Sequence, residues 1–311
     1  MNVQVRRIFQ AMGCSITLGM VGMSSPAVGA QPAAVDAKAS PAGAKHTFWA
    51  VPKQSGGTMY ILGSIHFANE DLYPLPAVIT QAFEESETLV LEVDMGAVQS
   101  PSFAFEMMQK GMYEEGDRIQ DHISEETFSL LERESERAGF PVSHFLRFKP
   151  WYCGNFLMIS ALKKHGYNPV LGVDIHFYRE ATAADKRVIG LESPEFQLGL
   201  LSGLSEKEAD EFLFQALTEL CDIRAFADSL LRMWRLGDTE RLGALIAESF
   251  EGADDLYEVL FTKRNLAWVE RLTGLAESPG DLFVVVGAGH LVGEGGLVDL
   301  LSKAGFSPRQ L

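Results

Sequence analysis

The stretch TMYILGSIH, residues 58–66, has a counterpart near the far end of the chain, DLFVVVGAGHL, residues 281–291. In each stretch, a short apolar run rich in β-branched or aromatic residues ends in the pattern Gly-x-x-His. Such runs predict buried strands, and each glycine predicts a sharp turn off the end of its strand. The carboxyl ends of parallel strands are where an α/β sheet binds ligands. We therefore expect His66 and His290 to reach the same edge of one sheet.

Two further strand-like runs end in carboxylates. TLVLEVD, residues 88–94, ends in Glu92 and Asp94, and RVIGLE, residues 187–192, ends in Glu192. Two imidazoles with a carboxylate on one edge can bind a metal ion or carry out acid–base chemistry. A single histidine at a strand end is more often structural, but the repeated pattern favours a functional site. The usual zinc spacings, His-Glu-x-x-His and Cys-x-x-Cys, do not occur in the sequence.

The order of the expected elements predicts one α/β domain, residues 46–311, with a central, mostly parallel sheet and flanking helices. Aromatic and β-branched runs on both sides of a Gly-rich turn at residues 53–57 predict a hairpin. A strand, a helix over about residues 77–87 and a second strand form a βαβ unit, so these strands should be parallel. Residues 172–176 should return to the strand edge. Helical patterns dominate from about residue 100 to residue 280, which predicts an inserted helical subdomain.

The N-terminal residues predict export. Arg6 and Arg7 precede an apolar stretch and a small-residue cleavage site, which is typical of a signal peptide over residues 1–30. Residues 31–45 are rich in Ala, Pro, Ser and Gly and predict a flexible lead-in. No later run is long and apolar enough for a membrane span. We expect a periplasmic or secreted protein whose mature chain has no stable membrane span.

Charge narrows the class of partner. The formal net charge is −16, and removal of Arg6 and Arg7 leaves 24 basic against 42 acidic residues, or −18. This excess of negative charge argues against nucleic acid and anionic lipid as binding partners, because a protein binds either one through clustered Lys and Arg.

Two cysteines, Cys153 and Cys221, remain after cleavage. In an oxidising compartment they form either one disulfide or two buried free thiols, and the sequence alone leaves both alternatives open.

Two other catalytic or binding motifs are incomplete. Ser64 follows Gly63, but the pattern Gly-x-Ser-x-Gly is not matched, so Ser64 is interpreted as a turn residue. Gly287-Ala-Gly289 resembles a phosphate-binding loop, but Val292 stands where the third glycine belongs. Nucleotide binding is therefore rejected. Arg264 begins a half-buried helix, where it either pairs with a carboxylate or lies on the surface.

Several short segments, taken in order, carry a family resemblance. They are GSIH, LVLEVD, GVDIHF, GLESPEFQ, KRNLAW and VVVGAGHLVG. Together they resemble the TraB/GumN family, which includes the Tiki-type proteases, from about residue 46 to the C-terminus. The resemblance implies an α/β fold of the EreA/ChaN-like group. It also implies a metal-dependent peptidase site built from two Gly-x-x-His motifs and a glutamate, with manganese or cobalt favoured.

The sequence and the resemblance together lead us to expect an exported metal-dependent hydrolase, with a peptidase as the favoured class and a peptide or protein as substrate. The expected metal ligands are His66, His290 and Glu92, with Mn²⁺ or Co²⁺ favoured and Zn²⁺ as the alternative. Glu92 or Glu192 is the expected general base or acid, and Arg264 either stabilises an oxyanion or holds a carboxylate.

Two other functions stay open at this point. One is a non-catalytic protein that binds a metal, haem or a peptide. The other is a metal-independent esterase that uses His66 as its base.

Overall fold

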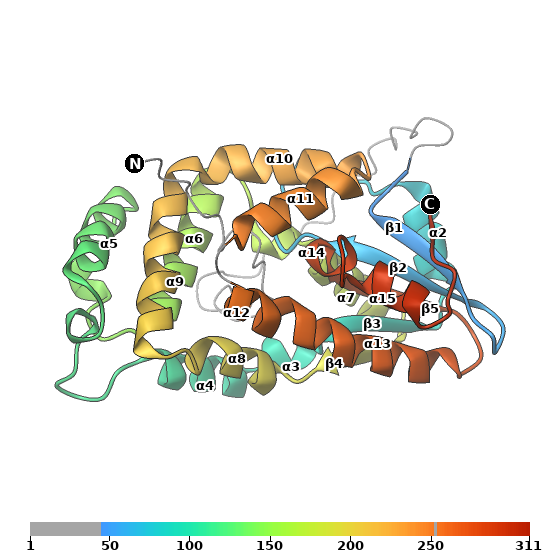
Figure 1. The fold of residues 1–311 in the computed structure, drawn as a ribbon, viewed down its shortest axis with the longest axis horizontal. Helices are drawn as coiled ribbons and strands as arrows, with labels where there is room; N and C mark the ends of the chain where they lie inside the picture. The colour runs from blue at the N-terminus through green and yellow to red at the C-terminus, as the bar shows by residue number, and fades with distance from the viewer. Residues whose placement is uncertain (1–44, 252–253) are drawn as a thin grey trace.

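The computed structural model describes residues 45–251 and 254–311 (Figure 1). The predicted signal peptide, residues 1–30, and residues 31–44 of the predicted lead-in lie outside the described residues. Within the described ranges, no helix has the length and apolar character needed to cross a membrane.

A six-stranded sheet of order β4-β3-β5-β2-β1-β6 forms the centre of the molecule. The four strands β2, β5, β3 and β4 are parallel, whereas β1 pairs antiparallel with β2 and with β6. The fold is therefore α/β with a mostly parallel sheet, as the sequence predicts, and the β1–β2 hairpin is confirmed. The strands are β1 (Phe48–Pro52), β2 (Thr58–Ser64), β3 (Thr88–Val93), β4 (Arg187–Glu192), β5 (Leu282–Gly287) and β6 (Arg309–Gln310).

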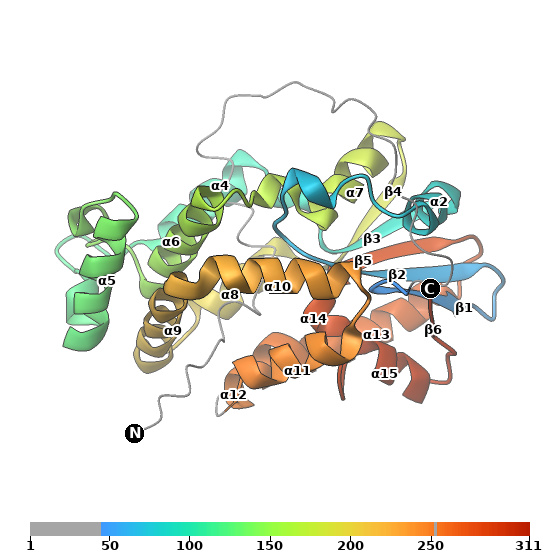
Figure 2. The same ribbon diagram turned by 90° about the horizontal axis from the view of Figure 1, so that it is seen from above.

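Helices cover both faces of the sheet (Figure 2). Every residue of β5 is buried, as expected for a central parallel strand covered on both sides. On one face Phe283 packs against Phe83 of α2 and Phe177 of α7, with ring centroids 5.3 and 4.7 Å apart. On the other face lie α13, with its fully buried Trp268, and α15. These layers contain α2 (Ala77–Glu85), α3 (Met95–Val98), α7 (Val173–Ala183), α13 (Lys263–Ala276), α14 (Ala288–Leu291) and α15 (Leu297–Lys303).

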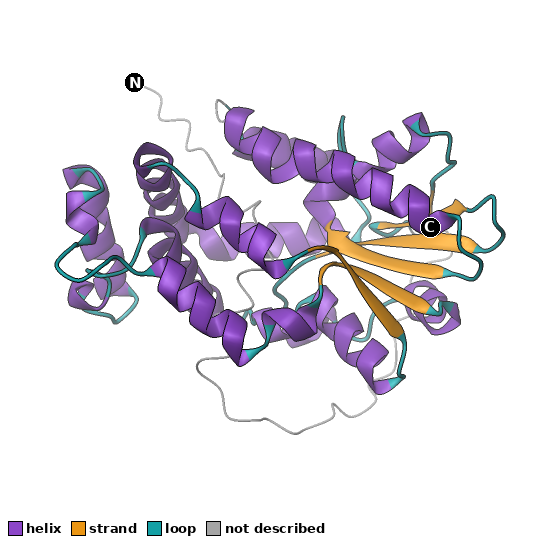
Figure 3. Cartoon of the chain, turned by 90° about the horizontal axis from the view of Figure 1, so that it is seen from below, coloured by secondary structure: helices purple, strands orange, loops and turns teal. Residues whose placement is uncertain are grey.

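The parallel strands point toward a second, largely helical region (Figure 3). Leu131, Leu157 and Leu213 belong to a separate hydrophobic cluster of this region. The strand β4 also lies within the predicted insert of residues 100–280, so the chain returns to the sheet once inside that range. The helices here are α4 (Pro101–Gly111), α5 (Glu125–Arg137), α6 (Pro150–Lys164), α8 (Pro194–Ser202), α9 (Glu206–Glu219), α10 (Ile223–Arg235), α11 (Thr239–Ser249) and α12 (Asp254–Tyr257).

Short turns of tighter or wider helix join these elements. A π-helical turn, Glu258–Thr262, leads from α12 into α13. The 3₁₀ turns are Glu70–Leu72, Ile119–Asp121, Val142–His144, Pro169–Leu171 and Leu220–Asp222.

The two cysteines are both free thiols. Cys153 on α6 is buried, whereas Cys221 in the turn between α9 and α10 is exposed. Of the two alternatives left open by the sequence, the disulfide is therefore not formed, and only one of the thiols is buried.

Residues 172–176 return to the strand edge, where Asp174 contacts His66, but the strand end predicted for them is wrong. Residues 172–176 do not form a strand end, because α7 already begins at Val173, with Gly172 as its N-cap. Val173 and Ile175 alternate with polar residues as in a strand, but Val173, Phe177 and Ala181 are all buried at a spacing of four. That spacing places them on one face of a helix, and it overrides the short alternating pattern.

Gly63 has a different role from the turn that the sequence predicts. It lies inside β2 rather than after it, and it packs against Thr47 and Ala288 from other segments of the same polypeptide. A Cβ at Gly63 would stand 2.6 Å from Thr47 Cγ2 and 2.9 Å from Ala288 Cβ. The glycine therefore allows the close approach of α14, the short helix that carries His290.

We predict that Gly63→Ala lowers the free energy of unfolding by about 1–3 kcal/mol, because the added methyl overpacks this contact. Urea unfolding measures the change. Adding Thr47→Ser should recover part of the loss, since serine lacks Cγ2 but keeps the hydroxyl that donates to Trp234 O. Gly274→Ala on α13 is the matched control, because a Cβ there meets no atom within 4 Å. Equal effects at residues 63 and 274 would contradict the packing explanation.

Candidate functional site

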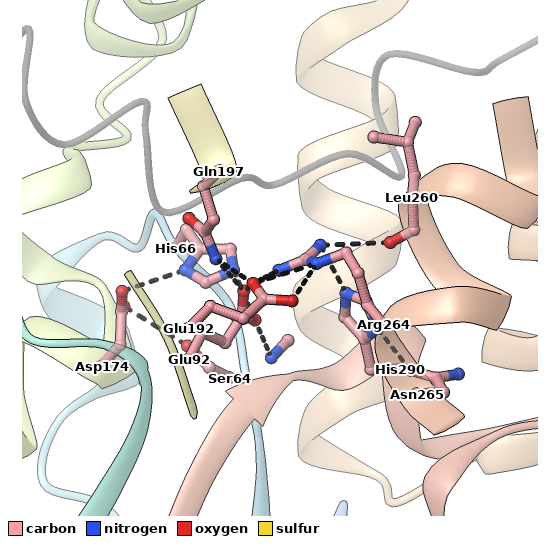
Figure 4. A network of polar contacts seen from close by, with 11 residues as sticks. Ser64, His66, Glu92, Asp174, Glu192, Gln197, Leu260, Arg264, Asn265 and His290 are labelled. Atoms are coloured by element: carbon pink, nitrogen blue, oxygen red, sulfur yellow. Dashed lines mark hydrogen bonds and ion pairs between the residues drawn. The ribbon is translucent and has the colours of Figure 1, made fainter. Parts of the chain in front are cut away.

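All five predicted site residues lie together at the carboxyl edge of the sheet (Figure 4). Glu92 and Glu192 are on β3 and β4, which pair in parallel. His66 follows β2, and His290 lies on α14 directly after β5. Arg264 reaches the same place from α13. Four of the five residues are no more than 7% exposed, and the side chain of Glu192 is 6% exposed.

The strand register brings the two Gly-x-x-His motifs side by side. Ser64 on β2 pairs with Gly287 on β5. A Cβ at Gly287 would stand 3.1 Å from Glu92 Oε1, 3.4 Å from His66 Nε2 and 3.5 Å from His290 Cδ2. Three of the predicted residues therefore converge on the space that a side chain at residue 287 would fill.

Asp174 fixes the orientation of His66. The first turn of α7 docks beside His66 through a hydrogen bond from Val173 N to Ile65 O (3.0 Å). Asp174 Oδ2 lies 3.0 Å from His66 Nδ1, and its other oxygen accepts a bond from Ser64 Oγ (3.3 Å). Because an ionised carboxylate only accepts, we assign the proton to Nδ1. Nε2 then faces the site, 3.8 Å from Glu92 Oε1.

The ionisation of His66 follows from these neighbours. Burial alone would lower the pKa of His66, but the charge and hydrogen bond of Asp174, together with the charge of Glu92, outweigh it. The pKa of His66 is therefore raised above the ordinary 6.5.

His290 has the opposite environment. Its Nδ1 lies 2.7 Å from Asn265 Oδ1, and its Nε2 lies 3.2 Å from Arg264 Nη1. Because guanidinium only donates, Nε2 carries the lone pair and Nδ1 the proton. Burial and the positive charge of Arg264 lower the pKa of His290 to about 3. The imidazole also packs on Phe261 and Trp268, with ring centroids 4.5 and 4.4 Å away.

Arg264 is the centre of the hydrogen-bond network. Its Nε and Nη2 both donate to Glu192, and Nη2 also donates to Glu92 Oε2 at 2.9 Å. Its Nη1 donates to Leu260 O at 3.1 Å, and the guanidinium lies 4.7 Å from the Trp268 ring centroid. Of the two roles expected for Arg264, this geometry matches the one that holds carboxylates.

Glu92 stays ionised in this setting. Burial alone would raise its pKa, but the positive charge of Arg264 opposes this most strongly, and the Gly287 N–H also donates to Oε1 at 2.7 Å. The pKa of Glu92 is lowered to about 2. An ionised, hydrogen-bonded carboxylate of this kind is a weak proton acceptor near neutral pH.

Gln197 belongs to the site although the sequence analysis did not select it. From α8 its Nε2 donates to Glu92 Oε2 at 3.2 Å and to Glu192 Oε2 at 3.0 Å. In the described part of the chain its Oε1 is buried and has no hydrogen-bond partner, which costs about 1–3 kcal/mol. A usable signal existed, because Gln197 lies in the first turns of the helix that directly follows the Glu192 strand end.

Other polar residues near the strand ends lie outside the network. Asp94, the second carboxylate of its strand run, is exposed and caps α3 by accepting from Gly96 N at 2.8 Å. His176 packs against Tyr73 and Phe177, with ring centroids 4.9 and 5.0 Å away.

The site contains some features of a metal site. His66 Nε2 and Glu92 Oε1 face each other across 3.8 Å without a hydrogen bond, and a divalent cation suits nitrogen and carboxylate donors. His290 points to the same space, but Arg264 holds its Nε2. Among the residues that the structure describes, no group of three or more His, Cys, Asp or Glu is placed so that it could hold a metal ion as it stands.

Comparison with known proteins places the chain in a family. The model of the TraB/PrgY/gumN family matches residues 47–310, which include every residue of the site. The chain belongs to the TraB/PrgY/gumN family. This membership confirms the resemblance noted in the sequence.

Two relatives of this family member match over most of their length. The uncharacterised protein YbaP of Escherichia coli strain K12 is 27% identical over 242 residues, covering 78% of this chain and 87% of YbaP. An uncharacterised protein of Treponema pallidum strain Nichols is 23% identical over 274 residues, covering 82% of this chain and 80% of that protein. No solved structure gives a significant match.

We predict that Arg264→Met lowers the free energy of unfolding by about 3–5 kcal/mol, because it leaves buried carboxylates without their cation. Denaturant unfolding measures this loss. Adding Glu192→Gln should recover part of it by removing one negative charge. Arg271→Met, on the exposed side of the same helix, is the control. It removes only the hydrogen bond from Arg271 Nη1 to Leu191 O, so its loss should stay within about 1.5 kcal/mol. If Glu192→Gln gave no recovery, the charge argument would be wrong.

We also predict that His290 stays neutral at pH 5 and carries its proton on Nδ1, because its pKa is lowered to about 3. Long-range ¹H–¹⁵N spectra of histidine-labelled protein report both properties, and His290→Gln assigns the signal. Asn265→Leu should weaken the preference for the Nδ1 tautomer, since it removes the acceptor. A charged His290 at pH 5 would contradict the arrangement.

Proposed function

We propose that this protein is an exported metal-dependent hydrolase and that its favoured substrates are peptides. The observation that carries the proposal is the convergence of His66 Nε2, Glu92 Oε1 and the His290 ring on the space beside Gly287. The peptidase class is favoured by the resemblance of the two Gly-x-x-His motifs to those of Tiki-type proteases. Periplasmic or secreted localisation follows from the predicted signal peptide.

In this proposal His66, Glu92 and His290 hold the cation, with Mn²⁺ or Co²⁺ favoured over Zn²⁺. The residue types suit such a cation, because His66 Nε2 faces the site and Glu92 is ionised. His290 becomes a ligand only when its hydrogen bond to Arg264 is broken. When bound, the cation supplies Lewis acidity, which makes water a nucleophile near neutral pH.

The remaining residues position groups and move protons. Asp174 holds His66 in the tautomer that leaves Nε2 free to act as a donor atom, a common partner arrangement for metal-binding histidine. The pKa of Glu92 is about 2, which makes Glu92 a weak base near neutral pH, so Glu192 is the remaining candidate for the general base or acid. Arg264 keeps Glu192 in place through three hydrogen bonds.

A second candidate is a metal-independent hydrolase such as an esterase. It is favoured by the His66–Asp174 pair, which leaves His66 Nε2 facing the site as in a general base. Ser64 Oγ donates to Asp174 rather than to His66, so the nucleophile in this candidate is water.

Titration of chelator-stripped protein, residues 31–311, with Mn²⁺, Co²⁺ and Zn²⁺ tests the first proposal. We predict binding that His66→Ala/His290→Ala weakens by at least about 100-fold, since two of three ligands are lost. The double variant His144→Ala/His165→Ala is the control, because both histidines are exposed. A peptide library, with and without chelator, then reports hydrolysis.

Each result points to one function. Metal-dependent cleavage that the site variant abolishes is the expected outcome. Binding without cleavage would favour a non-catalytic binding protein, and cleavage that resists chelators would favour the metal-independent hydrolase. Equal metal affinity in all three proteins would show that the site is not where metal binds.

A further inference from the structure

Among the described residues, the side-chain oxygen of Gln197, Oε1, has no hydrogen-bond partner. Gln197 is 1% exposed, and both neighbouring carboxylates accept from its Nε2. These two bonds fix the side-chain amide, because turning it over would place Oε1 against carboxylate oxygens that cannot donate. Oε1 therefore points away from Glu92 and Glu192 (Figure 4). Within residues 45–251 and 254–311, nothing donates to it.

The backbone also holds Gln197 in place. It lies in the first turns of α8, where Ser193 caps the helix by accepting from Phe196 N and where Pro194 begins it. The backbone N–H of Gln197 donates to Ser193 O at 3.3 Å. A fixed, buried acceptor without a donor is unfavourable in the protein alone. The acceptor lies at the carboxyl edge of a parallel sheet, where ligands bind, so a donor on a bound ligand would satisfy it.

The surrounding charges select the kind of donor. The two carboxylates beside Gln197 are ion-paired with Arg264. A cationic group entering the site would be attracted to those carboxylates rather than to a neutral amide oxygen. The amide oxygen instead matches a neutral N–H, and a peptide backbone presents one at almost every residue.

We propose that Gln197 is a specificity-determining residue whose Oε1 accepts a hydrogen bond from one backbone N–H of a peptide substrate. This inference rests on the proposed peptidase function. It predicts discrimination against substrates that lack that N–H, because the buried acceptor would then stay unpaired. Gln197 does not take part in bond breaking.

The test uses a substrate series on the purified protein. A peptide cleaved in the library screen is remade with each backbone N–H near the scissile bond replaced in turn, by N-methylation or by an ester linkage. We expect one replacement to lower kcat/KM of the wild type by about 10- to 100-fold. The same replacement should change kcat/KM of Gln197→Met by less than about threefold, since methionine offers no comparable acceptor.

Glu195→Gln is the matched control. It lies in the first turn of the same helix but is exposed, so it should leave both the cleavage rate and the wild-type penalty at that one position unchanged. A general structural role for Gln197 would lower kcat/KM for every substrate by the same factor and would leave the penalty unchanged.

The outcomes separate the two proposals. If the wild type cleaves no peptide, the proposed function fails and this inference falls with it. If peptides are cleaved but no N–H replacement is penalised, or if Gln197→Met keeps the full penalty, the inference about Gln197 is wrong and the peptidase proposal stands.

Discussion

The arrangement of the site depends on one buried cation, the guanidinium of Arg264, which lies between the carboxylates of Glu92 and Glu192. Burial away from water would by itself raise the pKa of the Glu92 carboxyl. Arg264 reverses this effect for Glu92, whose pKa falls to about 2. The same guanidinium donates to Leu260 O and His290 Nε2, so it connects the parallel strands to α13 and α14. Such a group is costly to bury and stable only when every donor is matched.

The position of Arg264 is set by its own helix. The π-helical turn Glu258–Thr262 directly precedes α13, and Lys263 N donates to Glu258 O five residues back. Turns of this kind are rare and occur often at functional sites. Here the turn ends two residues before Arg264, and the Trp268 ring one helical turn later lies against the guanidinium. Local backbone geometry and packing therefore fix the cation that the carboxylates require.

The sequence predicts the site residues at or just after strand ends better than most of those on longer helices. Arg264 of α13 is the helical residue that it does predict. His66, Glu92, Glu192 and His290 follow from apolar runs and their ends, because parallel strands deliver those ends to one edge. Asp174 and Gln197 reach the site from the first turns of α7 and α8. The direction in which a helix points depends on how the helix packs against the sheet. Neither the hydrophobic periodicity nor the capping residues of the helix specify this packing. The role of Gly63 escapes prediction for the same reason, since the contact with Thr47 and Ala288 exists only after folding.

The two Gly-x-x-His motifs show how one local pattern yields two different imidazoles. His66 meets a carboxylate on Nδ1, which raises its pKa. His290 meets a neutral amide on Nδ1 and a guanidinium on Nε2, and burial together with that guanidinium lowers its pKa to about 3. Environments that move the pKa values of similar groups apart are a recurrent way to give them separate tasks. His290 is neutral and already donates its only N–H to Asn265, so it cannot release a proton near neutral pH. Of the two histidines, only His66 has a pKa raised above the ordinary value, so His66 is the imidazole of this site that more readily carries a second proton.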